Sequence, residues 1–389
     1  MPSSDTNVAL VDHRTEPQKG TAPIQSVARF YRPELDILRF CAFLMVFLGH
    51  ALTVYPESPD WLKALKFIPG FGVPLFFALS AYLVTELLLT ERRLTGTVNV
   101  RYFYSRRILR IWPLYFLILG VGFLLSHRYP GTVVPSFALV SYMLLLGNWY
   151  TTRYGYLSFG LGPLWSISIE EQFYLLWPWV VRIATRRTLA VICLVGWVSS
   201  QASLFCFCYR HTMNSPAVWT NSVVQLQYFA IGVGLCLYLN GSVPKIRNGV
   251  RIAMILGALL LYVASECFFN ADGIRGLDDQ SSMAHTYPIY FFGGVSVLTI
   301  LIGFLGCASF RSWRGLRYLG KISYGLYVYH PMAIGLAAHI GELLRQGALF
   351  TLIFGLLADM GIAWLSYEYL EIPFMRLKER FAIVKSRGV

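Results

Sequence analysis

The sequence predicts an all-α polytopic membrane protein with about ten transmembrane helices and with both the N- and C-termini in the cytosol. Of its 389 residues, 56% are hydrophobic and only 14% are charged, and the mean hydropathy is +0.54. Soluble proteins of this length are far less apolar. Several apolar runs approach or exceed the roughly 20 residues that cross a bilayer, and they lack the short alternation of barrel strands.

Ten apolar segments are long enough to be membrane-crossing helices. In chain order they are residues 34–56, 68–90, 106–126, 163–183, 189–208, 219–239, 251–269, 287–306, 318–340 and 349–371. Residues 135–149 are apolar but short, which suits a re-entrant or interfacial piece better than a crossing. With the N-terminus inside and 135–149 not crossing, the inner loops and C-terminal tail hold 19 Lys and Arg residues and the outer loops hold 7. Because basic residues favour the cytosolic side, this count predicts two cytosolic termini.

The chain divides into a membrane domain and two tails. Residues 1–32 are polar and predict a disordered cytosolic tail without a cleavable signal peptide. Residues 33–375 form the transmembrane domain, and residues 376–389 form a basic cytosolic tail. The net charge of +13 lies in the loops between spans and sets orientation, so we expect no nucleic-acid partner. The seven cysteines show no zinc spacing, so we expect neither a disulfide framework nor a metal site.

Two ionisable residues, Arg39 and His50, lie in the first predicted span. A helix advances about 100° per residue, so eleven residues bring the two side chains within roughly 20° of each other, about 16 Å apart along the axis. Ionisable groups are costly inside a bilayer, and two on one face indicate a functional site. The alternative is an arginine that reaches the interface and an unrelated histidine packed against a neighbour.

The second and third spans add a serine and an arginine fork. Ser80 lies at mid-depth, after Gly and Pro residues that suggest a broken helix entrance or close helix packing. Arg106, Arg107 and Arg110 lie at the cytosolic mouth of the third span, three and four residues apart on related faces. Guanidinium groups bind phosphates through paired hydrogen bonds, so this fork suits an anionic ligand. A positive-inside anchor or a patch for anionic lipid headgroups is the alternative.

The fourth span contains two carboxylates, Glu170 and Glu171, which must face protein or water. Glu170 shares a helix face with Tyr174, which makes it the better candidate for chemistry. On the predicted topology Glu170 and His50 lie at comparable depth. A carboxylate beside an imidazole would hold its tautomer and raise its basicity.

Polar residues recur in the last two spans. Tyr324 and His330 lie in the ninth span, and Glu371 and Pro373 end the tenth. A structural role, in which such groups tie helices together, is as good an interpretation here as a role in a site.

Taken together and in this order, these motifs resemble the membrane-bound acyltransferase family 3. The matching residues are Arg39-x10-His50, Phe76-Phe77-Ala-Leu-Ser80, Arg107-x2-Arg110 followed by Pro113, Trp165-Ser-Ile-Ser-Ile-Glu170-Glu171-Gln-Phe-Tyr174, Ser323-Tyr324 with Tyr327 and His330, and Glu371-x-Pro373. The resemblance covers nearly all of residues 30–375, so residues 33–375 would be an acyltransferase-3-like domain. Ala81 departs from the glycine that the family usually has there. The hydrolase-like domain appended in some members is not expected here.

The resemblance implies transfer of an acyl group, often acetyl, from a coenzyme A thioester to a hydroxyl of a carbohydrate or glycosylated acceptor. It implies acyl-CoA as a co-substrate, no bound cofactor, and a multi-pass place in the cell membrane, expected to be a bacterial inner membrane. The expected partners are the lipid bilayer, acyl-CoA and the acceptor.

The resemblance also distributes roles among the candidate residues. His50 would be the general base, with a transient acyl-His50 as the alternative. Glu170 would orient His50 or bind the acceptor. The groups expected to hold the nucleotide phosphates are Arg39, Arg106, Arg107 and Arg110, and those expected to support the acceptor are Ser80, Glu171, Tyr174, Tyr324 and His330.

Two other function classes fit parts of the sequence. Intramembrane His, Glu and Arg residues could form the proton relay of a secondary transporter or exporter, although no pair of similar halves is visible. A lipid-binding scaffold is disfavoured, because polar groups in at least four spans cost stability without a role.

Overall fold

The computed structural model describes residues 31–54, 69–128, 132–158, 160–210, 215–269, 283–307, 310 and 312–384, and within these ranges it contains helices and no strands. The predicted tail 1–32 therefore lies, apart from its last two residues, outside the described residues. The first half of the chain forms α1 (Glu34–Thr53), the 3-10 turn η2 (Pro69–Phe71), α3 (Gly72–Thr95), α4 (Val100–Ser126), α5 (Ser136–Met143), α6 (Gly147–Tyr154), α7 (Leu164–Ile183) and α8 (Arg186–Tyr209).

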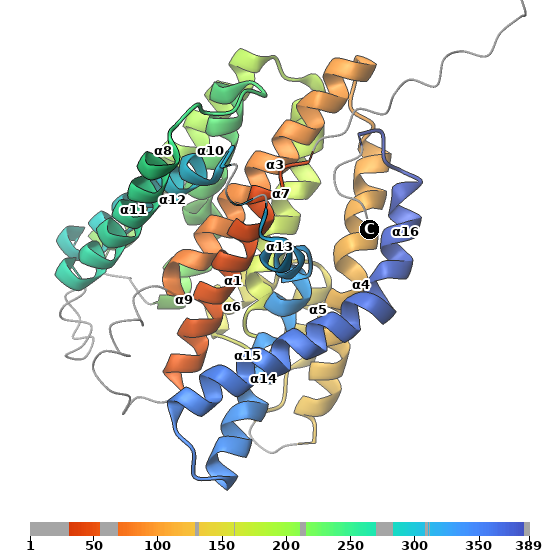
Figure 1. The fold of residues 1–389 in the computed structure, drawn as a ribbon, viewed down its shortest axis with the longest axis vertical. Coiled ribbons are helices and arrows are strands. Elements are labelled where there is room, and N and C mark those ends of the chain that lie inside the picture. Colours follow the sequence, from red (N-terminus) through yellow and green to blue (C-terminus); the bar gives the residue numbers. More distant parts are fainter. Residues whose placement is uncertain are drawn as a thin grey trace, which may run out of the picture.

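The second half of the chain continues with helices of 5 to 22 residues. It forms α9 (Ser215–Trp219), α10 (Ser222–Leu239), α11 (Asn248–Phe269), α12 (Met283–Phe304), α13 (Arg314–Lys321), α14 (Ser323–Leu343), α15 (Ala348–Ser366), the π-helical segment η5 (Tyr367–Glu371) and α16 (Ile372–Glu379). Figure 1 shows α1, α3 and α7 in the middle of the molecule, α8 and α11 at one edge, and α4 and α16 at the other.

The predicted class, an all-α polytopic membrane protein, is confirmed. Eight helices of the described chain are long and apolar enough to cross a membrane, and each matches one predicted span. The other two predicted spans correspond to α7 and α14, helices of 20 and 21 residues whose polar side chains lower their hydropathy. The short apolar run 135–149 forms α5 and the start of α6, two helices of eight residues each. At about 1.5 Å per residue each extends roughly 12 Å, too short to cross a bilayer alone.

Most span ends shift by a few residues, as in α4, which begins at Val100, and the last two spans and the C-terminal tail depart from the prediction in their geometry. The predicted span 318–340 is two helices, because the chain leaves helical geometry at Ile322, between α13 and α14. The predicted span 349–371 ends in the π-helical segment, where the amide of Ile372 donates to the carbonyl of Tyr367. Pro373, which has no amide hydrogen to donate, follows directly, and π turns relieve such breaks in a helix. Helix α16 then continues to Glu379, four residues into the predicted C-terminal tail.

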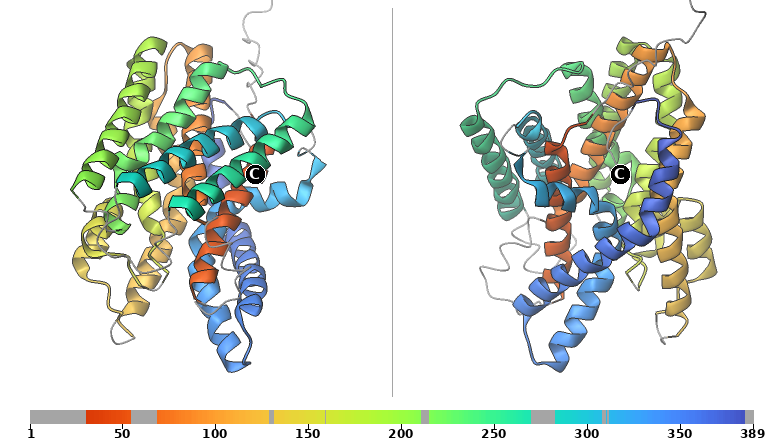
Figure 2. Two further views of the ribbon diagram at one scale, coloured as in Figure 1. Left: turned by 90° about the vertical axis from the view of Figure 1, so that its left-hand side faces the viewer. Right: turned by 45° about the vertical axis from the view of Figure 1, so that its right-hand side comes forward.

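The entrance to the second span is both broken and closely packed. The 3-10 turn η2 leads into α3 at Gly72. A Cβ atom on Gly72 would lie 2.4 Å from the backbone oxygen of Ala42, so only glycine lets α3 approach α1 this closely. Figure 2 shows α3, α8 and α10 running side by side, and α10 packs on both of the others.

Burial separates a central group of helices from a peripheral one. In α3, 72% of the residues in the span are buried, and in α1 67% are, whereas α8 and α11 bury only 17% each. In a membrane protein, long apolar helices with this much exposed surface face lipid. The polar motifs of α1 and α3 lie on well-buried helices, and the arginine fork lies on α4, where 33% of the span is buried.

Candidate functional site

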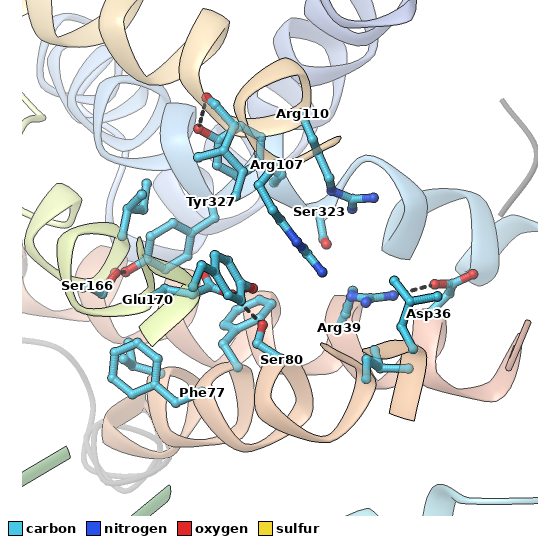
Figure 3. Close-up of a pocket in the computed structure, with 18 of the residues that line it drawn as sticks. Asp36, Arg39, Phe77, Ser80, Arg107, Arg110, Ser166, Glu170, Ser323 and Tyr327 are labelled. Atoms are coloured by element: carbon cyan, nitrogen blue, oxygen red, sulfur yellow. Dashed lines mark hydrogen bonds and ion pairs between the residues drawn. The ribbon is translucent and has the colours of Figure 1, made fainter. Parts of the chain in front are cut away.

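A cavity of about 170 Å³ lies between α1, α3, α4, α7 and α14. Seven of the eleven candidate residues line it: Arg39, Ser80, Arg107, Arg110, Glu170, Tyr174 and Tyr324. They come from helices that are far apart in sequence, so the fold brings together what the motifs contain separately. Figure 3 shows the guanidinium groups of Arg39, Arg107 and Arg110 pointing into the same space, with Glu170 and Ser80 across from them.

Four arginines line the cavity, and three of them, Arg39, Arg107 and Arg110, have few negatively charged partners, whereas Arg32 pairs with Glu86. Arg39 Nη1 donates to Asp36 Oδ1 at 2.8 Å, and the hydroxyl of Tyr31 donates to the other oxygen of Asp36 at 2.8 Å. Arg107 lies over the Tyr174 ring, 4.5 Å from its centroid. Neither Arg107 nor Arg110 forms a hydrogen bond or an ion pair within the described residues. Bringing like charges together without counterions is unfavourable, so this arrangement is suited to an anionic ligand.

Glu170 is held on one side and open on the other. Its Oε1 accepts hydrogen bonds from the hydroxyls of Ser80 on α3 and Tyr174 on its own helix. Tyr174 therefore touches both Glu170 and the guanidinium of Arg107. Across the described chain, Oε2 of Glu170 accepts no hydrogen bond, so it can accept one from a hydroxyl or amide that enters the cavity.

His50 lies outside this cavity and meets a second histidine. It is in the last turn of α1, where it is exposed, and its Nδ1 lies 3.0 Å from the Val46 carbonyl oxygen and 3.2 Å from Nε2 of the buried His330. His330 Nδ1 in turn lies 2.6 Å from the carbonyl oxygen of Tyr327. No hydrogen bond within the described ranges joins His50 to Glu170. The imidazole that the sequence analysis expected Glu170 to orient is instead contacted by His330.

The contacts of this histidine pair determine its tautomers. A carbonyl oxygen can only accept, so Nδ1 carries the proton in both rings. In the neutral pair, Nε2 of His330 accepts from Nδ1–H of His50. Nε2 of His50 then keeps its lone pair, which is the state that a general base requires.

Tyr327 connects the cavity to the histidine pair. Its ring lines the cavity and packs edge-on against Phe76, another lining residue, at 5.7 Å between centroids. The same ring lies 5.6 Å from the ring of His330, and its hydroxyl lies 2.6 Å from Ser166 Oγ. Sequence reasoning included Tyr327 in a motif but assigned it no role. Its place three residues before His330, on one helix face, was the signal available.

Asp36 was also missed by the sequence analysis. It is 1% exposed, and it is the ion-pair partner of Arg39. A carboxylate three residues before an arginine on a helix is a standard pairing distance, so the spacing alone contained this signal.

Arg106, expected to bind the nucleotide phosphates, does not line the cavity. Its Nη2 donates to Glu91 Oε2 at 3.1 Å, and its Nη1 donates to the carbonyl oxygen of Phe381 at 2.6 Å. Glu91 is fully buried at the end of α3, and this carboxylate takes Arg106 as its partner. Arg106 therefore ties α4 to α3 and to the segment after α16.

Two further candidates contact the helices around the cavity. Oε2 of Glu171 accepts from the indole nitrogen of Trp112 at 3.0 Å, between α7 and α4, and Glu171 does not line the cavity. The hydroxyl of Tyr324 donates to the carbonyl oxygen of Ile111 at 2.7 Å, which fastens α14 to α4 at the cavity wall. Within the described residues no group of three or more His, Cys, Asp or Glu side chains could hold a metal ion.

Comparisons with known proteins identify similar sequences. A family model described as an acyltransferase domain matches residues 32–368. A putative O-acetyltransferase of Staphylococcus aureus (strain MSSA476) is 26% identical over 374 residues, which covers 89% of this chain and 58% of the relative. The O-acetyltransferase OatA of Staphylococcus aureus (strain NCTC 8325 / PS 47) is 26% identical over 365 residues, with 89% and 57% covered. The chain thus spans a little over half the length of these relatives. No solved structure matches.

Proposed function

Because the chain belongs to the acyltransferase 3 family, we propose that it is an integral-membrane O-acyltransferase that uses acyl-CoA as the donor. The names of its relatives favour acetyl as the group transferred, and a hydroxyl of a carbohydrate or glycosylated molecule is the proposed acceptor. The cell membrane is the proposed location. The observation that carries the proposal is the cavity in which Arg39, Arg107 and Arg110 converge beside Glu170.

The arginines suit the donor. Coenzyme A carries several phosphate charges at one end, and guanidinium groups bind phosphate oxygens through paired hydrogen bonds. Arg107 and Arg110 make no hydrogen bond or ion pair within the described residues, so their donor groups are free for such a ligand. The pantetheine arm would leave this cavity along α1 toward His50, an axial rise of about 16 Å from Arg39.

Glu170 and its neighbours suit the neutral part of a substrate. Oε1 is occupied by Ser80 and Tyr174, which fix the carboxylate, and Oε2 can accept from an acceptor hydroxyl or from an amide of the pantetheine arm. We therefore give Glu170 a role in binding substrate, in place of a direct role in orienting His50.

His50 is the proposed general base. Its Nε2 takes the proton from the acceptor hydroxyl as that oxygen attacks the thioester carbonyl carbon. The tetrahedral intermediate collapses with cleavage of the carbon–sulfur bond, and the imidazolium returns the proton to the departing CoA sulfur. The products are the O-acyl ester and free CoA, and the Val46 carbonyl and His330 Nε2 together hold the starting tautomer of His50 by accepting from Nδ1–H.

The test is acyl transfer from radiolabelled acetyl-CoA by purified protein in liposomes, scored as CoA release with a panel of carbohydrate acceptors. His50→Ala should reduce turnover by at least about a hundredfold, the usual size of a general-base contribution. His339→Ala is the matched control, because His339 is an exposed histidine of α14 away from the cavity.

Three outcomes separate the function classes. CoA release that needs both His50 and an acceptor supports the acyltransferase and begins to identify its acceptor. Full activity of His50→Ala removes the general-base assignment while leaving the enzyme class. If the protein neither binds nor turns over any short acyl-CoA, and the same liposomes show proton-coupled flux, the transporter is favoured.

A further inference from the structure

A second cavity, of about 160 Å³, lies between the C-terminal half of α3, the first residue of α8 and the C-terminal end of α10. Its lining includes Arg92 and Arg93 from α3, Arg186 from α8, and Glu86. We propose that this cavity binds the phosphate headgroup of an anionic phospholipid. This inference goes beyond the acyl-transfer chemistry and uses none of the residues proposed for it.

The charge of the cavity is the first argument. Three guanidinium groups line it with one carboxylate, Glu86, and that carboxylate is already 3.0 Å from a guanidinium nitrogen of Arg32. Arg92 is half-buried and Arg93 and Arg186 are exposed, and in contrast to the buried Arg106, which pairs with Glu91, they have no carboxylate partner within the described residues. The cavity therefore keeps a surplus of positive charge that a phosphate would neutralise.

The three arginines keep donor groups for a ligand. Arg92 donates Nη1 to the carbonyl oxygens of Val181 and Ala184, at the C-terminal end of α7. Arg186 donates Nη2 to the carbonyl oxygen of Leu237 near the end of α10. These bonds orient both guanidinium groups but use only part of their five N–H donors each. Within the described chain none of the three arginines pairs with a carboxylate, and Arg93 bonds only Thr90, on its own helix, at 3.0 Å.

Exposed apolar side chains on α7, α8 and α10, the helices whose ends the arginines contact, favour a lipid among phosphate-bearing molecules. Ile183, beside the carbonyl that accepts from Arg92, is 81% exposed, and Tyr238, beside the carbonyl that accepts from Arg186, is 85% exposed. Along α8, Val191, Leu194 and Val195 are each more than half exposed. Such residues at the end of a membrane helix contact acyl chains, so a phosphate held in this cavity has its hydrocarbon tails beside α8.

The predicted orientation agrees with this occupant. The sequence-based topology puts the end of α3 and the start of α8 on the cytosolic side, where basic cavities between helices bind anionic headgroups. The nucleotide of coenzyme A is the other source of phosphate. It is disfavoured because the cavity that holds Arg39, Arg107 and Arg110 lies on the opposite face of α3, lined by Leu83 and Leu87.

The experiment measures the melting midpoint of the delipidated full-length protein in detergent against added lipid. The probes are dioleoylphosphatidylglycerol, dioleoylphosphatidylcholine and, in a separate arm, coenzyme A. Arg93→Gln is the test variant, since Arg93 fastens no other helix. Arg187→Gln is the matched control, because Arg187 is an exposed arginine next to Arg186 that does not line the cavity.

Phosphatidylglycerol should raise the midpoint saturably, and phosphatidylcholine should not. Arg93→Gln should need about fivefold more phosphatidylglycerol for the same rise, the effect of one basic residue near an anionic headgroup, whereas Arg187→Gln should match the wild type. Equal responses of the two variants would mean that diffuse surface charge explains the effect, which overturns the site. A loss of coenzyme A binding in Arg93→Gln, with the lipid response intact, would assign the cavity to the donor nucleotide. Because the readout needs no acyl transfer, its failure is distinguishable from failure of the proposed enzyme.

Discussion

Replacement of Gly320 by alanine should disturb the candidate active site from outside it. Gly320 is buried on α13, where it packs on the backbone of Asp36 in α1. A Cβ atom there would lie 1.7 Å from the Asp36 carbonyl oxygen, whereas real Cβ contacts do not fall below about 3.0 Å. The difference requires α1 and α13 to separate by roughly 1.3 Å, because the obstacle is backbone and cannot rotate away.

This separation would change the width of the cavity. Arg39 lines it from α1, and Tyr324 lines it from α14, which follows α13 after one residue. Overpacking of this kind costs roughly 1–3 kcal/mol of stability. A misplacement of about 1 Å between binding groups can cost as much as 100-fold in rate, so we expect kcat/KM for acetyl-CoA to fall roughly 10- to 100-fold.

The assay compares Gly320→Ala with Gly315→Ala. Gly315 is on the same helix, is exposed, and has no atom within 4 Å of the position of an added Cβ. Gly315→Ala should leave kcat/KM unchanged and should keep or slightly raise the melting midpoint, because alanine favours helix. Gly320→Ala should melt several degrees lower, at roughly 2–4 °C per kcal/mol. If the two variants have equal midpoints and equal kcat/KM, the close approach of α13 to α1 does not set the cavity, and the reasoning fails.

Substitutions at four positions test individual contacts. Arg106→Gln should lower the melting midpoint with KM for acetyl-CoA unchanged, because it leaves the buried carboxylate of Glu91 unpaired, a loss of roughly 3–5 kcal/mol. Arg107→Gln should raise the KM for acetyl-CoA about tenfold at an unchanged melting midpoint. If Arg106→Gln instead raised KM and Arg107→Gln instead lowered the midpoint, the roles of the two arginines would be reversed. His330→Gln should lower kcat at unchanged KM, and His330→Leu should lower it further, since only glutamine can accept from His50 Nδ1–H; equal rates would remove the positioning role. Asp359→Leu should raise the midpoint, because both oxygens of this fully buried carboxylate lack a hydrogen-bond partner in the described structure; a loss of acyl transfer would instead reveal a function.

The sequence predicted the helices well because hydropathy and length depend on local composition. The places where it failed involve geometry that hydropathy does not measure. The break at Ile322 lies inside an apolar run, and the π turn before Pro373 leaves the run continuous. A window of apolar residues has the same mean hydropathy whether the helix through it is straight or broken.

The candidate site shows the same division between local and long-range information. Helical spacing grouped Arg107 with Arg110, since both positions are on one helix, and both line the cavity. The same spacing grouped Arg106 with them, but Arg106 pairs with Glu91 on another helix and does not line the cavity. His50 and Glu170 were predicted to lie at equal depth, but depth does not determine which way two side chains point. The contact between His50 and His330 therefore could not be found from one sequence.

The π-helical segment Tyr367–Glu371 acts as a spacer that sets the rotational phase of the last helix. Its turn closes five residues back, so it contains one residue more than an α-helical turn. If the same residues followed an α-helical path, α16 would be rotated by about 100° and moved by about 1.5 Å along its axis. The carbonyl of Phe381, which Arg106 holds, would then face elsewhere. At this point of the chain the number of residues matters more than their identity, because any five residues that keep the wide turn would place α16 against α4.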